Sequence, residues 1–82
     1  MLRIRVLFFA RGRELAGCNE IEQEMEDGSD SKQLLEAVIA RFPALSEIST
    51  CLIVAVNQNY ETNPVPLKDG DEVALIPPIS GG

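Results

Sequence analysis

The stretch Leu2-Arg3-Ile4-Arg5-Val6-Leu7-Phe8-Phe9 decides how this chain of 82 residues folds. Its apolar side chains alternate, which is the pattern of a strand with one face against a core. The inward face is apolar throughout: Leu2, Ile4, Val6 and Phe8. The outward face begins with two arginines but turns apolar at Leu7 and Phe9. That end of the strand therefore carries apolar side chains on both faces.

The segments after this strand read as a turn and a second strand. A short helical turn is expected over residues 11–16, closed by Gly17. Residues 19–26 alternate again, with four glutamates on one face. A face of that kind is exposed to water and is typical of an edge strand protected by charge.

The main helix is predicted to begin at Asp30. Gln33 stands three residues later, which suits a capping box, although Ser31 is an alternative N-cap. Apolar residues then recur at helical spacing: Leu34, Leu35, Val38, Ile39 and Phe42. Pro43 is expected to end the helix.

The second half of the chain supplies three more strands. Residues 44–50 are predicted to be irregular or a short turn of helix. The run 51–56 is small and β-branched, so a buried strand is expected there, with Cys51 as a core residue at its start. A turn at 57–59 leads to a short strand over 60–62, and the last strand covers 73–76.

This order of elements predicts an α+β domain with the ubiquitin-like β-grasp fold, a mixed sheet with one main helix across one face. In that fold the first and last strands lie side by side and parallel at the centre. The end of the first strand and the start of the C-terminal tail must then emerge at the same edge. The expected organisation is a domain over residues 1–76 and a flexible, reactive tail over 77–82.

The tail reads Pro77-Pro78-Ile79-Ser80-Gly81-Gly82. The prolines stiffen its base and cannot extend a sheet ladder, whereas glycine leaves the backbone open to approach from nearly any side. Six extended residues reach about 20 Å, enough to carry a carboxylate into the active site of another protein. Gly82 is therefore the candidate reacting residue. The alternative is an unordered end without a role.

Leu7 and Phe9 are expected near the exit of this tail, on the face away from the helix. An apolar patch there, rimmed by Arg3, Arg5 and Arg11, predicts a docking surface for a partner protein. The alternative is that a loop covers the two apolar side chains.

Composition narrows the classes of function. The net charge of −6 disfavours nucleic acid and anionic membranes as partners and favours basic surfaces of other proteins. Cys18 and Cys51 form no CxxC motif and the chain has no histidine, so no zinc site is expected. A disulfide between them stays open, and Cys18 is expected to be incidental. The first apolar run is too short for a signal peptide and no stretch reaches membrane length, so a cytosolic location is expected.

Four blocks of sequence resemble one family. They are Leu7-Phe8-Phe9-Ala10-Arg11 with Arg13-Glu14-Leu15, then Ala55-Val56-Asn57-Gln58, then Leu67-Lys68-Asp69-Gly70-Asp71-Glu72-Val73, and the proline and glycine tail. In this order they are similar to the small, sulfur-carrier subunit of molybdopterin synthase.

The resemblance implies a reaction cycle. A ubiquitin-activating-like adenylyltransferase would use ATP to join the Gly82 carboxylate to AMP, and a sulfur donor would displace AMP to leave a thiocarboxylate. The tail would then enter the large synthase subunit and pass sulfur to cyclic pyranopterin monophosphate, building the molybdopterin dithiolene. The family's complex is a heterotetramer with one carrier at each end of a large-subunit dimer. The carrier itself would be a cosubstrate without bound cofactor or metal, not an enzyme.

Three other functions remain open at this point. One is a sulfur carrier for thiamine or tRNA thiolation, which shares the fold and the paired glycines. Another is a ubiquitin-like protein modifier that forms isopeptide bonds through Gly82, although only Lys32 and Lys68 could support chains on itself. The last is an interaction domain with an incidental tail.

Overall fold

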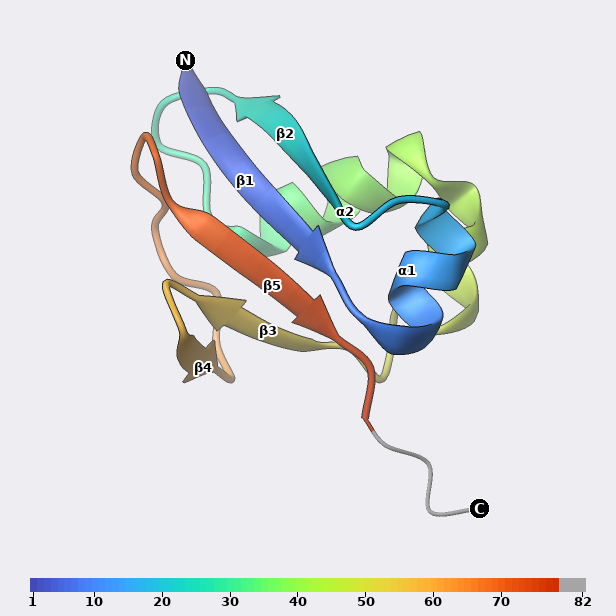
Figure 1. Cartoon of the computed structure of the whole chain (residues 1–82). Helices are drawn as coiled ribbons and strands as arrows, with labels where there is room; N and C mark the ends of the chain where they lie inside the picture. The colour runs from blue at the N-terminus through green and yellow to red at the C-terminus, as the bar shows by residue number, and fades with distance from the viewer. Residues whose placement is uncertain (79–82) are drawn as a thin grey trace.

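The first strand, whose apolar side chains alternate, lies inside a mixed sheet of five strands (Figure 1). The computed structural model describes residues 1–78. Its elements follow in this order: β1 (Leu2–Phe8), α1 (Ala10–Ala16), β2 (Glu20–Met25), α2 (Ser31–Arg41), the 3-10 turn η1 (Pro43–Glu47), β3 (Ile53–Val56), β4 (Asn59–Glu61) and β5 (Glu72–Ile76). The strand order is β2-β1-β5-β3-β4, with β1 and β5 parallel and the other neighbours antiparallel. The β-grasp prediction is confirmed.

The core lies between the sheet and α2. The inward residues of β1 are 0–8% exposed, and they pack with Leu34 and Val38 of α2 and with Val73 and Leu75 of β5. Phe8 meets Phe42 edge to face, with the ring centroids 5.6 Å apart. The expected division of β1 into a buried and an outward face is therefore confirmed.

The capping box at the start of α2 is confirmed as well. The backbone N–H of Gln33 donates to Asp30 Oδ1 at 2.8 Å, and the Asp30 N–H donates to Gln33 Oε1 at 2.9 Å. Ser31 is not the N-cap. Its hydroxyl oxygen accepts from the backbone N–H of Val65 at 3.0 Å and so ties the helix start to a distant loop.

The prediction for Cys51 is wrong. Its side chain is exposed, and its backbone N–H donates to the carbonyl of Ile48 at 3.0 Å, so the chain is still turning there. The strand begins only at Ile53. Cys18 is half-buried against the core, and both thiols are free, so the disulfide that stayed open is not formed.

The edge strand β2 matches its sequence pattern. Glu20, Glu22 and Glu24 are exposed, while Ile21 and Met25 pack against the core. β4 forms the opposite edge of the sheet and is three residues long. Among residues 1–78, no helix has the length and apolar character needed to cross a membrane.

Candidate functional site

The parallel pairing of β1 with β5 brings the end of one strand beside the exit of the other. Leu7 lies opposite Ala74, and Phe8 lies opposite Leu75. Pro77 follows β5 directly and faces Gly12 of α1. The end of β5 lies beside α1 (Figure 1). The predicted meeting of the first strand's end and the tail's base is confirmed. Pro77 itself is buried and Pro78 is exposed, whereas Ile79, Ser80, Gly81 and Gly82 lie outside the described residues.

A shallow apolar depression of about 280 Å³ lies on the sheet face that α2 leaves uncovered. We call it the sheet-face patch, and its lining residues are Leu7, Phe9, Ala55, Gln58, Tyr60, Glu72, Ala74 and Ile76. Phe9 is 44% exposed and Leu7 is half-buried, so no described loop hides this pair. Alternate residues of a strand share one face, so Ala55, Ala74 and Ile76 could have been assigned to this outward face from the sequence of β3 and β5. The prediction of the docking surface did not use this pattern.

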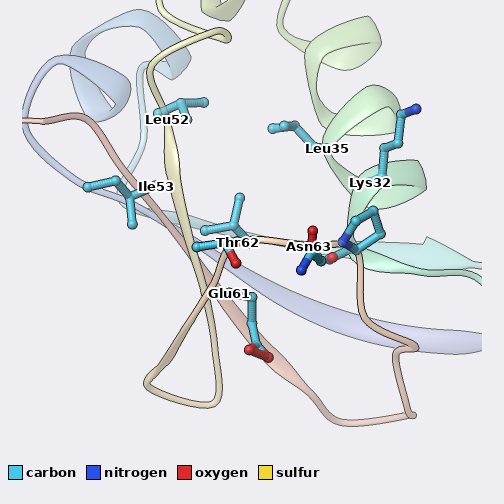
Figure 2. Close-up of a pocket in the computed structure, with 10 residues that line it drawn as sticks. Lys32, Leu35, Leu52, Ile53, Glu61, Thr62 and Asn63 are labelled. Carbon is cyan, nitrogen blue, oxygen red and sulfur yellow. The ribbon is translucent and has the colours of Figure 1, made fainter.

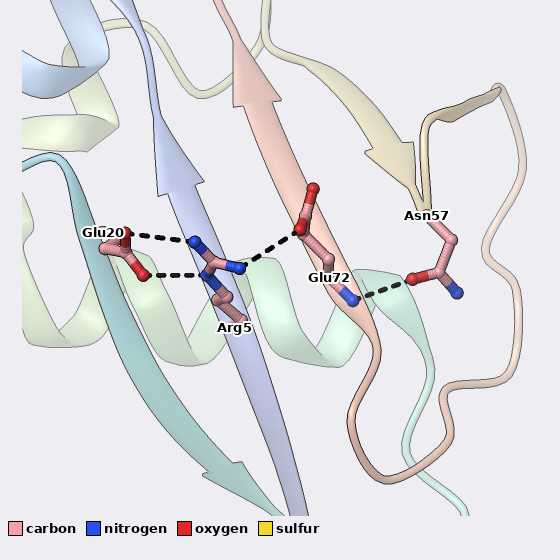
Figure 3. A network of polar contacts seen from close by, with 4 residues as sticks. All are labelled: Arg5, Glu20, Asn57 and Glu72. Atoms are coloured by element: carbon pink, nitrogen blue, oxygen red, sulfur yellow. Dashed lines mark hydrogen bonds and ion pairs between the residues drawn. The ribbon is translucent and has the colours of Figure 1, made fainter.

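A polar network borders the sheet-face patch (Figure 3). Arg5 Nε lies 2.8 Å from Glu20 Oε2, and Arg5 NH1 lies 3.6 Å from Glu72 Oε2. The hydrogen bond from Arg5, followed by the attraction of its charge, lowers the pKa of Glu20. The backbone N–H of Glu72 donates to Asn57 Oδ1 at 3.0 Å, and the Asn57 amide donates to Asp71 Oδ1 at 2.9 Å. The network therefore joins three strands and the turn after β3.

That turn has an uncommon backbone. Asn57 and Gln58 both have left-handed φ values, 49° and 71°. Two left-handed residues suit the tight turn between β3 and β4. Asparagine adopts this conformation readily, but glutamine does not. The turn thus holds Gln58, a lining residue, at a cost in backbone strain.

The three arginines expected at the rim differ in position. Arg5 sits beside the sheet-face patch and pairs with a lining residue, as described above. Arg3 lies two residues earlier on the same strand and is absent from the lining. Arg11 turns to Glu14 and Glu47, at N···O distances of 3.0 and 3.2 Å. It ties α1 to η1 and does not line the depression.

A second hollow, of about 380 Å³, lies between the start of α2 and the β3–β4 hairpin (Figure 2). Its walls include Leu35 and Leu52, with Lys32 and Glu61 as the charged members. It shares no lining residue with the sheet-face patch. Within residues 1–78, no three His, Cys, Asp or Glu side chains are grouped so as to hold a metal ion.

Known proteins resemble this chain along almost its whole length. The model of the ThiS family matches residues 6–82. A Chlamydomonas reinhardtii protein named molybdopterin synthase sulfur carrier subunit is 47% identical over 83 residues, covering 99% of this chain and 100% of that protein.

Solved structures also resemble this chain along almost its whole length. A putative molybdopterin converting factor, subunit 1, from Pyrococcus furiosus has a TM-score of 0.87 and 32% identity, covering 96% of this chain and 100% of that one. SAMP1 (small archaeal modifier protein 1) from Haloferax volcanii has a TM-score of 0.88 and 26% identity, over 98% and 99%. A Helicobacter pylori complex of subunits 1 and 2 of molybdopterin-converting factor has a TM-score of 0.72 and 27% identity, covering 99% of this chain and 100% of that one.

Proposed function

The chain belongs to the ThiS family, and from this membership we propose that it is the sulfur-carrier subunit of molybdopterin synthase. The observation that carries the proposal is the full-length match, at 47% identity, to a relative named for that role. Of the sequence blocks that resemble the family, residues 7–15 lie where the tail leaves β5, whereas residues 55–58 and 67–73 meet at the other end of β5.

The chemistry resides in the tail. A carboxylate is a poor electrophile, because its charge repels nucleophiles and oxide is a poor leaving group. In the proposed cycle, Gly82 attacks the α-phosphate of ATP on an activating enzyme, and pyrophosphate leaves. A sulfur donor then forms a bond to the Gly82 carbonyl carbon, and AMP leaves with the former carboxylate oxygen. The resulting thiocarboxylate gives its sulfur to cyclic pyranopterin monophosphate.

The partner in the last step is the large synthase subunit. The Helicobacter pylori complex of subunits 1 and 2 supports a two-subunit assembly. In the proposal Leu7 and Phe9 of the sheet-face patch dock on that subunit. A docking role for Arg11 would require it to exchange its contacts with Glu14 and Glu47. The catalytic acids and bases belong to the partner, in a heterotetramer with one carrier at each end.

A second candidate function is protein modification. The similarity to SAMP1 favours it, because that neighbour is named a modifier and covers nearly the whole chain. A modifier would transfer the Gly82 acyl group to a lysine amine instead of accepting sulfur. Lys32 and Lys68, both exposed, are the two lysines on which it could build chains of itself.

Intact mass decides between these functions. The carrier is incubated with the activating enzyme, ATP and a sulfur source, and then with the large subunit and the pyranopterin. A gain equal to one exchange of oxygen for sulfur, lost again on adding the large subunit and pyranopterin, is the expected result. Sulfur that is gained but not discharged would assign the chain to thiamine or tRNA thiolation. Lysine adducts without any sulfur gain would assign it to protein modification.

A further inference from the structure

We infer that Gly12 of α1 and Pro77 form an anchor that fixes where the reactive tail leaves the domain. The inference rests on the proposed function, since it gives Gly12 a positioning role in sulfur delivery. Gly12 is the buried residue of α1, and Pro77 is buried just after β5. A Cβ atom added at Gly12 would lie 3.8 Å from Pro77 Cγ. The proline ring therefore faces the helix at Gly12, with room for no more than a methyl group between them.

Two other groups complete the anchor. The same added Cβ would lie 3.9 Å from Ile48 Cδ1 and 3.9 Å from the carbonyl oxygen of Leu75. Ile48 caps η1, and the ion pair between Arg11 and Glu47 ties that turn to α1. α1 thus contacts both the end of β5 and η1.

The chain reaches this arrangement through a sharp reversal after β1. Ala10 has a left-handed φ of 50°, which is unfavourable for alanine. The carbonyl of the preceding residue, Phe9, accepts the N–H of Gly12 at 2.9 Å and so starts the helix. A strained residue persists only where its surroundings compensate for it. Here the reversal returns α1 to the exit of β5, where its glycine meets Pro77.

The anchor shortens the part of the tail that is free to reach a partner. The fixed φ of Pro77 and the packing of its ring set the direction of the chain at that point. Only residues 78–82 extend beyond the anchor, a reach of about 17 Å when fully extended. A fixed starting point places Gly82 within a limited volume, which reduces the ordering entropy lost when the tail is inserted. Gly12 would act on the reaction only through Pro77.

Space at Gly12 defines the test variants. An alanine methyl group would make ordinary van der Waals contacts, so Gly12→Ala should keep the anchor. The longer side chain of Gly12→Leu must displace Pro77 or Ile48. Pro77→Gly removes the ring without adding bulk, and it carries the test if Gly12→Leu does not fold. Arg13→Leu places the same leucine side chain at an exposed position of α1 and is the control.

Two measurements on the full chain decide the matter. Nuclear Overhauser effects between Gly12 and the Pro77 ring are expected in the wild type, with the corresponding effects in Gly12→Ala and their loss in Gly12→Leu. Single-turnover sulfur delivery to the large subunit should slow about tenfold to a hundredfold in Gly12→Leu and Pro77→Gly, with the Kd for that subunit unchanged. The double variant should be no slower than the slower single variant.

Three results would overturn the anchor: absent effects between Gly12 and Pro77 in the wild type, wild-type delivery by Pro77→Gly, or equal slowing in Arg13→Leu. A parallel loss of affinity for the large subunit and of the sulfur-delivery rate would also count against the anchor, because general loss of structure would then explain the effect. A wild-type chain that never gains sulfur would refute the proposed function. The contact between Gly12 and Pro77 would still be decided by the resonance data.

Discussion

Leu7 lies directly opposite Ala74 across the parallel pair of β1 and β5, and both line the sheet-face patch. Because the two strands run in the same direction, Phe9 and Pro77 follow them at the same edge of the sheet. A partner that binds the apolar side chains there also meets the base of the tail. In the proposed function, docking and presentation of Gly82 would thus be coupled by the register of two strands.

Removing Gly82 should abolish sulfur uptake, since the carbon that is adenylated and thiolated would be lost. Gly81→Phe should allow folding but block the proposed insertion, because the ring adds bulk to the part of the tail that would enter the large subunit. Intact mass and single-turnover delivery measure the two effects, and thermal unfolding is the control, with wild-type Tm expected for both. Delivery by either variant at the wild-type rate would contradict the assignment of the tail.

Phe9→Glu should weaken binding to the large subunit by about 2 kcal/mol, the cost typical of losing a central interface side chain. The charge would have to be buried against apolar surface without a partner. Titration calorimetry of the carrier with the large subunit gives the Kd. Ala40→Glu places the same charge at an exposed position of α2, on the opposite side of the sheet, and should leave the Kd unchanged. Equal affinities for all three proteins would mean that docking uses another surface.

Arg5→Gln should raise the pKa of Glu20, because the hydrogen bond and the charge that lower it are lost. A carboxyl whose pKa is lowered on folding stabilises the native state above its unfolded value, and this contribution is lost as pH falls through the folded pKa. The wild type should therefore be the more stable protein near neutral pH, and the difference should disappear in acid.

Carbon-detected titration of the Glu20 carboxyl group follows the pKa, and urea unfolding across the same pH range follows the stability. A difference in stability that persists at low pH would show that Arg5 acts through packing of its aliphatic chain and not through the ion pair.

Gln58→Gly should raise the free energy of unfolding by about 1 kcal/mol, because glycine adopts the left-handed backbone without the clash that a Cβ causes. Asn59→Gly is the matched control, since the neighbouring position lies in β4 and has no positive φ. Glycine there should destabilise the protein. Urea unfolding of the two variants compares them, and a Gln58→Gly protein less stable than the wild type would mean that the side chain contributes more than the strain costs.

Local signals in the sequence were sufficient for most of the fold. The alternation in 2–9 identified the buried and outward faces of β1, and Asp30 with Gln33 identified the start of α2. Both depend on neighbours within a few residues. The parallel pairing of β1 with β5 followed from the order of elements, because the β-grasp arrangement is a simple way to cover one sheet with one helix.

The sequence pattern was misleading just before β3. The apolar run over 51–56 suggested a buried Cys51, but the turns that follow η1 continue through Cys51 and the strand begins only at Ile53. Arg11 was expected at the rim of the docking surface, and in the structure it pairs with Glu14 and Glu47. Pro77 is buried because α1 packs beside it. The one sign of this in the sequence was Gly12, a glycine inside a helical turn where alanine would be more stable.

The two outer strands of the sheet, described above for their sequence patterns, also govern how copies of the chain behave toward one another. β2 presents glutamates along one edge, and β4 is only three residues long at the other. Charged or very short edges do not template pairing with a second sheet. Copies of the chain should therefore not pair edge to edge through β2 or β4, even at high protein concentration.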